Sequence, residues 1–206
     1  IDRVEARAML KQLLTSHINV MLVSPRRWGK SSLVKKAMDE LQQEDKNIRV
    51  CYIDAFCIGS EAEFYRIFAS RVIACASSKM ERWVNDAKRF LTGVVPQIVV
   101  NDQITDFVAF DLKFVPQEQD KLTILHLPEI LAKDKGIKII VCIDEFQQLA
   151  NIPEYKDMEG KMRSVWQQQQ NTSYCLYGSK RNMMLNIFNN SNSPFYRFGQ
   201  VIFMNK

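Results

Sequence analysis

A Gly-Lys-Ser sequence after a short loop is the clearest chemical pattern in this chain of 206 residues. The loop follows the apolar run 18–23 and leads into a segment, 32–38, whose composition suits a helix. Its residues are Ser24, Pro25, Arg26, Arg27, Trp28, Gly29, Lys30, Ser31 and Ser32. Strand, tight loop and helix in this order predict a phosphate-binding loop, in which amides and the positive dipole end at the helix start attract phosphate oxygens.

The residues at the end of this loop have distinct expected roles. Gly29 lets the backbone approach a phosphate closely, Lys30 adds a positive charge, and the hydroxyl of Ser31 can ligate Mg²⁺. The usual pattern begins with glycine where this chain has Ser24, so a positive φ at that residue would carry a conformational cost. The alternative is that Gly-Lys-Ser only begins an ordinary helix.

A second candidate element is a strand that ends in two acids. Residues 136–143 are rich in β-branched side chains and lead directly to Asp144 and Glu145. Such a run predicts a central parallel strand, and the carboxyl end of such a strand is where open α/β sheets hold ligands. There Asp144 would hold a Mg²⁺-bound water, as in a Walker B element, and Glu145 would orient the attacking water. The alternative is a strand that simply ends where charge meets solvent.

A third element is the aromatic-rich strand expected from Thr172, which Asn171 bounds before it and Gly178 and Ser179 bound after it. A polar residue just beyond a strand that neighbours Asp144 can contact the γ-phosphate or its water, and Ser179 is our candidate for that sensing role. The equally weighted alternative is that Gly178 and Ser179 only make a turn.

The composition is that of an ordinary globular domain. Hydrophobic residues make up 47% of the chain, and the formal net charge is +5. This charge permits acidic partners, including nucleic acid, without requiring them. No apolar run approaches the roughly 18–20 residues that span a bilayer, so no membrane partner is expected. Because the chain begins without methionine, we expect it to be a piece of a longer protein.

The cysteines and histidines indicate no site of their own. The cysteines are widely spaced, without metal-ligand spacing, at Cys51, Cys57, Cys75, Cys142 and Cys175. We interpret them as buried reduced thiols, which favours a cytoplasmic protein. His17 and His126 are far apart and lack a nucleophile or ligand partner, so core or surface roles are expected for both.

Hydrophobic periodicity places the remaining elements. Helices are expected at 2–16, from the loop to about 45, without interruption over 61–91, and at 121–135, 154–170 and 181–188. A second buried strand is expected at 47–54 and a last strand at 199–204. Alternating strands and helices predict an α/β sandwich with a parallel sheet.

An inserted β-hairpin is expected at 97–115. Residues 97–100 and the alternating stretch 104–114 would form its strands, with a turn near Asn101 and Asp102. Such a hairpin would be either an interaction surface or, as slightly favoured here, an extra pair of edge strands.

These motifs together resemble the prokaryotic ATPases of the AAA+/STAND branch, which carry a Pro-Arg-Arg-x-Gly-Lys loop. The resemblance rests on Ser-Pro-Arg-Arg-Trp-Gly-Lys-Ser-Ser-Leu, Cys-Ile-Asp-Glu-Phe-Gln and Tyr-Gly-Ser-Lys-Arg and spans nearly the whole chain. It implies a P-loop NTPase three-layer sandwich over 1–206, with a central, mostly parallel sheet of about five strands. It also implies a helical lid, and often a winged-helix domain, which we expect to be missing from this chain.

The same resemblance implies roles for residues outside the three motifs. Arg3 and Glu5 would lie in the segment that approaches the nucleotide base. Arg197, just before the final strand, would be an arginine finger that reaches the γ-phosphate of a neighbouring subunit; a surface arginine is the favoured alternative. For Arg26 and Arg27 we expect a solvated or partner-facing role.

The sequence thus predicts an ATPase with ATP and Mg²⁺ as ligands, in which hydrolysis drives a conformational change. Glu145, Lys30, Ser179 and Arg197 are its candidate catalytic residues, and Ser31 and Asp144 its metal ligands. A nucleotide-dependent switch with little hydrolysis is the runner-up, and a small-molecule kinase comes third because an acid beside Asp144 is of little use to a kinase. A homo-oligomer, and a protein or DNA partner bound through the missing C-terminal domain, are partners that the sequence allows without requiring them.

Overall fold

A computed structural model describes residues 3–77, 80–91, 95–100 and 108–204. Its centre is a five-stranded sheet in which every neighbouring pair of strands is parallel, which confirms the predicted α/β architecture. Across the sheet, the strands follow the order β2 (Ile48–Asp54), β5 (Lys138–Asp144), β6 (Thr172–Gly178), β1 (Val20–Val23) and β7 (Gln200–Phe203). Since parallel strands end at the same edge of a sheet, β1, β5 and β6 bring the three candidate motifs to one edge.

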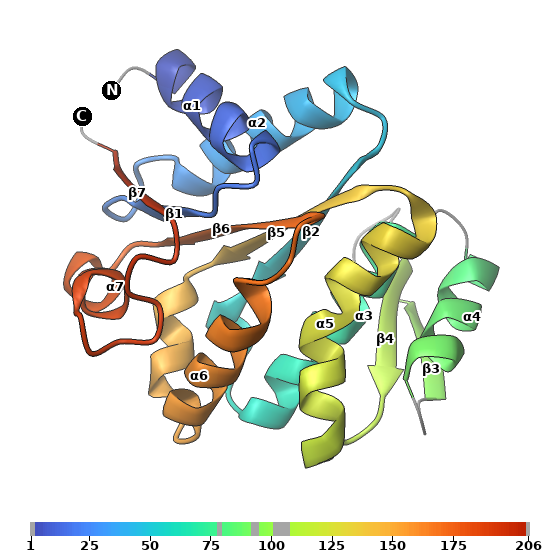
Figure 1. The fold of residues 1–206 in the computed structure, drawn as a ribbon. Helices are drawn as coiled ribbons and strands as arrows, with labels where there is room; N and C mark the ends of the chain where they lie inside the picture. Colours follow the sequence, from blue (N-terminus) through green and yellow to red (C-terminus); the bar gives the residue numbers. More distant parts are fainter. Residues whose placement is uncertain (1–2, 78–79, 92–94, 101–107, 205–206) are drawn as a thin grey trace.

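Helices cover both faces of the sheet (Figure 1). On one face, α1 (Arg3–Thr15) and α2 (Lys30–Glu44) form a core with β1 that includes Leu10, Leu22 and Val34. The other face carries α3 (Glu61–Ala76), α5 (Glu118–Lys135), α6 (Tyr155–Trp166) and α7 (Arg181–Asn189). Two short 3₁₀ helices, η1 (Ala55–Cys57) and η2 (Phe146–Asn151), follow β2 and β5. The result is the expected three-layer sandwich, and none of the described helices is both long enough and apolar enough to cross a bilayer.

Strand burial follows position in the sheet. All seven residues of β6 are buried because strands lie on both sides of it and helices cover both of its faces. The strand predicted as buried at 47–54 is buried only in part: β2 forms one edge of the sheet, with Ile48, Cys51 and Ile53 buried and Tyr52 and Asp54 exposed.

The helical stretch predicted over 61–91 is two helices rather than one. The first, α3, ends at Ala76, and α4 (Met80–Phe90) follows it. Ser77 has extended backbone angles, and its hydroxyl donates a hydrogen bond of 2.7 Å to Asp86 in α4. Serine competes with helical backbone bonding through its own side chain, so a run without proline or glycine need not stay helical.

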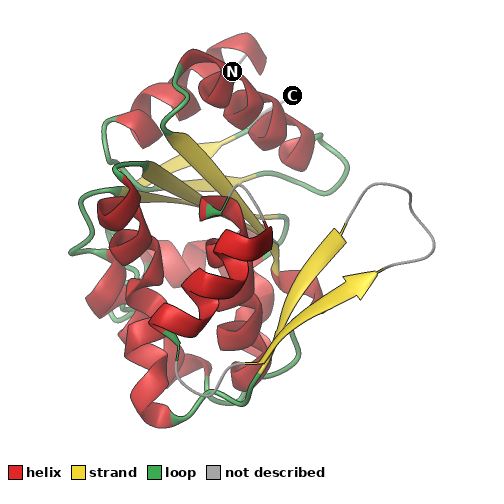
Figure 2. Cartoon of the chain, turned by 90° about the vertical axis from the view of Figure 1, so that its right-hand side faces the viewer, coloured by secondary structure: helices red, strands yellow, loops and turns green. Residues whose placement is uncertain are grey.

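The predicted hairpin is present as β3 (Val95–Val100) and β4 (Val108–Lys113), which pair antiparallel. It forms a separate two-stranded sheet that extends away from the body of the molecule (Figure 2). The favoured interpretation as extra edge strands was therefore wrong for the described residues, and the turn expected near Asn101 and Asp102 lies outside them. Leu112, which is fully buried, anchors β4 in the core beside α3.

Two further expectations need correction. The helix predicted at 154–170, where the polar composition favours a solvated helix, is the shorter α6, and one of its faces is buried through Met158, Met162 and Trp166. All the cysteines are free thiols, but Cys57 is exposed, so only part of the set is buried as expected.

Candidate functional site

The loop between β1 and α2 adopts left-handed backbone conformations at Arg27 (φ 65°) and Gly29 (φ 72°). Ser24 has no positive φ; it is 1% exposed, and its N–H donates to the carbonyl of Gly178 at 3.3 Å. The conformational cost expected at Ser24 is therefore absent, and Arg27 takes the strained position instead. Arg27 and Arg26 are exposed, in line with the solvated role expected for them.

Lys30, the first residue of α2, is only 7% exposed. Its Nζ lies 2.8 Å from Asp144 Oδ1 and 3.1 Å from Glu145 Oε1, and 5.2 Å from the centre of the Tyr177 ring. A nearly buried ammonium group is costly without partners, and here two carboxylates from the end of β5 supply them. The two motifs that are 114 residues apart in sequence thus meet in one ion-pair cluster.

The hydroxyl of Ser31 lies 2.5 Å from Asp144 Oδ2. A hydroxyl and a carboxylate at this separation are oxygen donors that can both reach one Mg²⁺ ion, which retains water and phosphate oxygens as its other ligands. No group of three His, Cys, Asp or Glu side chains suited to a metal occurs in the described ranges, and a magnesium ion bound together with a nucleotide does not need one.

Glu145 is held by donors on both carboxylate oxygens. Lys30 contacts Oε1, while Oε2 accepts hydrogen bonds from Gln147 Nε2 at 2.6 Å and Ser179 Oγ at 2.8 Å. Burial alone raises the pKa of Glu145, but the bonds from Gln147, Ser179 and Lys30 together bring that pKa below its ordinary value. Glu145 is therefore ionised at neutral pH and fixed in direction.

The sequence analysis assigned no role to Gln147, although this residue ends the Cys-Ile-Asp-Glu-Phe-Gln motif, two residues after Glu145. It is completely buried, and its Oε1 has no hydrogen-bond partner among the described atoms. A Cβ atom added to Gly178 would lie 1.8 Å from that oxygen and 2.9 Å from Met184 Sδ. Gly178 thus leaves the space that Gln147 needs to reach Glu145, which the turn interpretation of Gly178 and Ser179 did not anticipate.

Arg3 lies against the loop. Its Nη2 is 3.5 Å from the carbonyl oxygen of Trp28, and a Cβ atom on Gly29 would be 3.4 Å from the same nitrogen. The start of α1 is therefore next to the place expected for phosphate, where an exposed guanidinium adds positive charge. Glu5 is exposed, and Ser32 is an exposed residue in the first turn of α2.

Among the candidate catalytic residues, Arg197 is the one that the fold does not bring to this cluster. It is exposed, has a φ of 53°, and lines a hollow of about 390 Å³ with Phe188, Asn189 and Tyr196. It precedes β7, whose first residue pairs with Val20 at the beginning of β1. The loop follows the other end of β1, so roughly 13 Å of strand lies between the two places, and Arg197 cannot serve the phosphate site of its own chain.

Comparisons with known proteins support the fold. No family model and no curated protein matches the chain. A Walker-type ATPase of Pyrococcus abyssi is similar in structure (TM-score 0.63, 18% identity), over 98% of this chain and 53% of that protein. The Orc1 protein of Aeropyrum pernix, solved in complex with DNA, is similar over 98% of this chain and 44% of that protein (TM-score 0.59, 12% identity). The ORC2 protein of Aeropyrum pernix, solved in ADPNP–ADP complexes, is similar over 98% of this chain and 46% of that protein (TM-score 0.52, 13% identity). The chain spans about half the length of these proteins, and at such identity the likeness shows a P-loop ATPase fold alone.

Proposed function

We propose that this chain binds ATP with Mg²⁺ and hydrolyses it, and that hydrolysis is coupled to a conformational change. The observation that carries the proposal is the meeting of Lys30 and Ser31 with Asp144 and Glu145 at the carboxyl edge of the sheet. The fold shared with a Walker-type ATPase of Pyrococcus abyssi is consistent with it.

Each residue of this cluster has a role in the proposal. The amides of the first turn of α2 lack intrahelical partners and would receive phosphate oxygens, together with the ammonium group of Lys30. Ser31 and Asp144 would hold Mg²⁺, which neutralises charge on the phosphates when bound. Glu145, ionised and fixed by its donors, would orient the water that attacks the γ-phosphate.

Two substitutions test this proposal. Lys30→Ala should lower ATP affinity at least tenfold, because it removes the charge that faces the phosphates, whereas the exposed Lys36→Ala on the same helix should not. Glu145→Gln should keep ATP binding and abolish phosphate release. Binding is measured with a fluorescent nucleotide, and thermal unfolding shows whether each variant is folded. Intact affinity in the folded Lys30→Ala protein would contradict the proposal.

A nucleotide-dependent switch with little hydrolysis is the second candidate. It is favoured by the three donors that engage Glu145, because a carboxylate held by Lys30, Gln147 and Ser179 must be released before it can act on water. Ser179→Ala separates the two functions. If Ser179 restrains Glu145, its removal raises basal turnover; if Ser179 senses the γ-phosphate during hydrolysis, its removal lowers turnover.

The assembly in which this domain works is also a proposal. By the AAA+-like resemblance, Arg197 would complete the phosphate site of a neighbouring copy, and DNA or a protein would be bound through a further domain. The similar Orc1 protein was solved with DNA. If Arg197 acts between copies, Arg197→Ala in the full-length protein should lower turnover only at concentrations at which the copies associate.

A further inference from the structure

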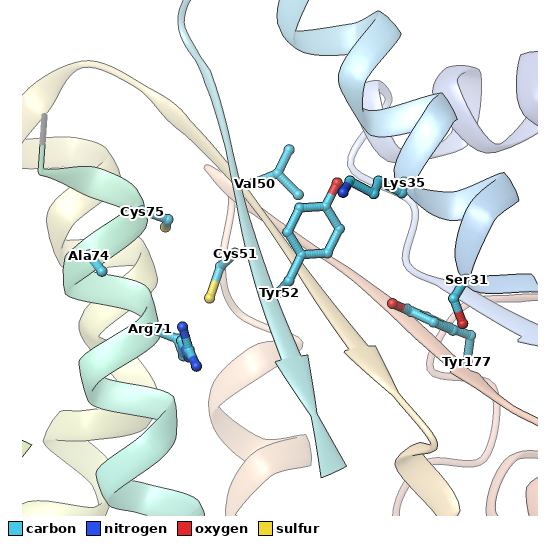
Figure 3. A pocket seen from close by; sticks show the side chains of 9 residues that line it. All are labelled: Ser31, Lys35, Val50, Cys51, Tyr52, Arg71, Ala74, Cys75 and Tyr177. Carbon is cyan, nitrogen blue, oxygen red and sulfur yellow. The ribbon is translucent and has the colours of Figure 1, made fainter. Parts of the chain in front are cut away.

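A second hollow lies at the free edge of β2, between α2 and α3 (Figure 3). Its volume of about 480 Å³ is in the range of ligand-binding clefts. Ser31 and Lys35 come from α2, Val50 and Tyr52 from β2, Arg71 and Cys75 from α3, and Tyr177 from β6. One end of the hollow therefore reaches the phosphate loop. In Figure 3, Tyr52 extends on the side of β2 towards Lys35, whereas Arg71 lies on the side of α3.

The backbone of β2 is open towards this hollow. β2 pairs with β5 over all seven of its residues without a bulge, and within the described part of the chain no strand pairs with its other side. The carbonyl of Asn47 accepts a hydrogen bond from Lys138 and so points towards β5. Because alternate residues of a strand point their backbone groups to opposite sides, Val50 and Tyr52 direct their N–H and C=O groups outward.

This edge lacks three of the features that usually protect an edge strand, although its beginning carries the charged Arg49. Edge strands are typically short, bulged, interrupted by proline, charged, or covered by a helix or loop. The opposite edge strand, β7, has four residues, whereas β2 has seven and no proline. Only the beginning of β2 is covered, because Arg49 Nη1 donates to the carbonyl of Ile48 at 3.0 Å. The backbone from Val50 to Tyr52 is left available to another strand.

The charges beside this edge favour an acidic occupant. Lys35 and Arg71 are exposed on opposite sides of β2, and neither forms an ion pair with any other described residue. Asp39, on α2, is an acid that lies close enough to Tyr52 to affect its pKa. Burial is the main cause of the raised pKa of Tyr52, and the negative charge of Asp39 adds to it. A second copy of β2 would bring its own Arg49 beside these cations, so pairing between copies is opposed by like charge.

We propose that the β2 edge, from Val50 to Tyr52, binds an extended acidic segment of a partner protein, which adds to the sheet as a sixth strand. Backbone bonds from the outward groups of Val50 and Tyr52 would hold the segment, while Lys35 and Arg71 select acidic side chains. A nucleic acid strand is disfavoured, because its backbone has no N–H groups to donate to the outward carbonyls of β2.

A display library of random octapeptides, selected against the whole chain without nucleotide, tests this proposal independently of ATP binding. The enriched peptides should carry Asp or Glu at alternate positions among β-branched residues. The Lys35→Glu, Arg71→Glu double variant should bind the best peptide at least tenfold more weakly, since two attractions become repulsions. Lys36→Glu, an exposed lysine on α2 outside the hollow, should change the affinity less than twofold.

N-methylation of the selected peptide tests the strand geometry. Two peptides, methylated on odd or on even amides, should differ at least tenfold in affinity, because only one set of amides faces β2. Three results would overturn the proposal. The first is that no acidic peptide is enriched on the parent chain relative to the double variant, and the second is that the two methylated peptides bind with equal affinity. The third is that a single-stranded oligonucleotide displaces the bound peptide as well as the unlabelled peptide does. Thermal unfolding verifies that each variant is folded.

Discussion

Replacing Gly178 by alanine tests whether Gln147 is wedged between β6 and Glu145. The new Cβ would lie 1.8 Å from Gln147 Oε1, a separation that no packed structure allows. Gly178 has no positive φ, so the substitution brings no backbone strain of that kind. Relief requires that Gln147 move, and this side chain is completely buried and bonded to Glu145 at 2.6 Å. Gly178→Ala should therefore destabilise the fold and release Glu145 from one of its donors.

The expected size follows from the cost of overpacking a core, about 1–3 kcal/mol. A value near 2 kcal/mol lowers the melting temperature by about 4–8 °C for a chain of this length. With a urea m-value of about 3 kcal/mol/M, the midpoint of unfolding falls by about 0.7 M. Chemical denaturation followed by tryptophan fluorescence measures this shift, and an unchanged m-value shows that the free energy of unfolding itself has changed.

The same substitution elsewhere provides the control. Gly160 lies inside α6, and a Cβ atom added to it would have no other atom within 4 Å, so Gly160→Ala should stabilise the protein by about 0.5–1 kcal/mol. In a Gln147→Ala background the contact at 1.8 Å is gone and the flexible Met184 side chain, with Sδ at 2.9 Å, is the remaining neighbour, so Gly178→Ala should cost less than in the parent chain. An equal loss of unfolding free energy in the two backgrounds would show that Gln147 does not occupy the space beside Gly178, and would refute our account of how Glu145 is fixed.

Two further predictions concern stability away from the site. Gly199→Ala should lower the free energy of unfolding in urea more than Gly178→Ala does. Its Cβ would lie 2.1 Å from the backbone oxygen of Asn19, and a backbone atom cannot move away by rotating as a side chain can. A smaller loss would contradict this reasoning. The second concerns Glu159, whose pKa is raised by burial against the lowering effect of the hydrogen bond that Ser193 Oγ donates to it at 2.8 Å. A raised pKa means that this group favours folding at low pH and loses that contribution as the pH rises through its folded-state pKa. Glu159→Gln should therefore raise the melting temperature at pH 7, and the gain should shrink towards pH 4. The exposed Glu154→Gln is the control, and a gain that is the same at both pH values would show that charge burial is not the cause.

The phosphate loop was predictable because its parts are adjacent in sequence. Gly29, Lys30 and Ser31 lie within one turn at the start of α2, so local spacing alone sets their relative positions. That the loop and Asp144 lie at one edge was expected from the rule that ligands bind at the carboxyl ends of parallel strands, whereas the ion pair of 2.8 Å between Lys30 Nζ and Asp144 Oδ1 was not predicted. Most helices and strands were likewise predictable from periodicity, with boundaries that shift by a few residues.

The donors to Glu145 depend on the tertiary structure. Ser179 is 34 residues away and meets Glu145 only because β6 lies next to β5. Gln147 is close in sequence, but no periodic pattern indicates that it turns back to Glu145 through the space above Gly178. Contacts of this kind arise from side-chain packing, which single-residue types do not reveal.

The sequence by itself determined the order of strands and helices and the chemical groups available at the loop and at the end of β5. Only the tertiary structure decided which strand lies at the sheet edge and that Arg197 lies away from its own phosphate site. The physical reason is that alternation and helical period describe how one segment faces a core, whereas strand order depends on interactions between segments far apart in the chain. The open edge of β2, with Lys35 and Arg71 beside it, follows from that order alone.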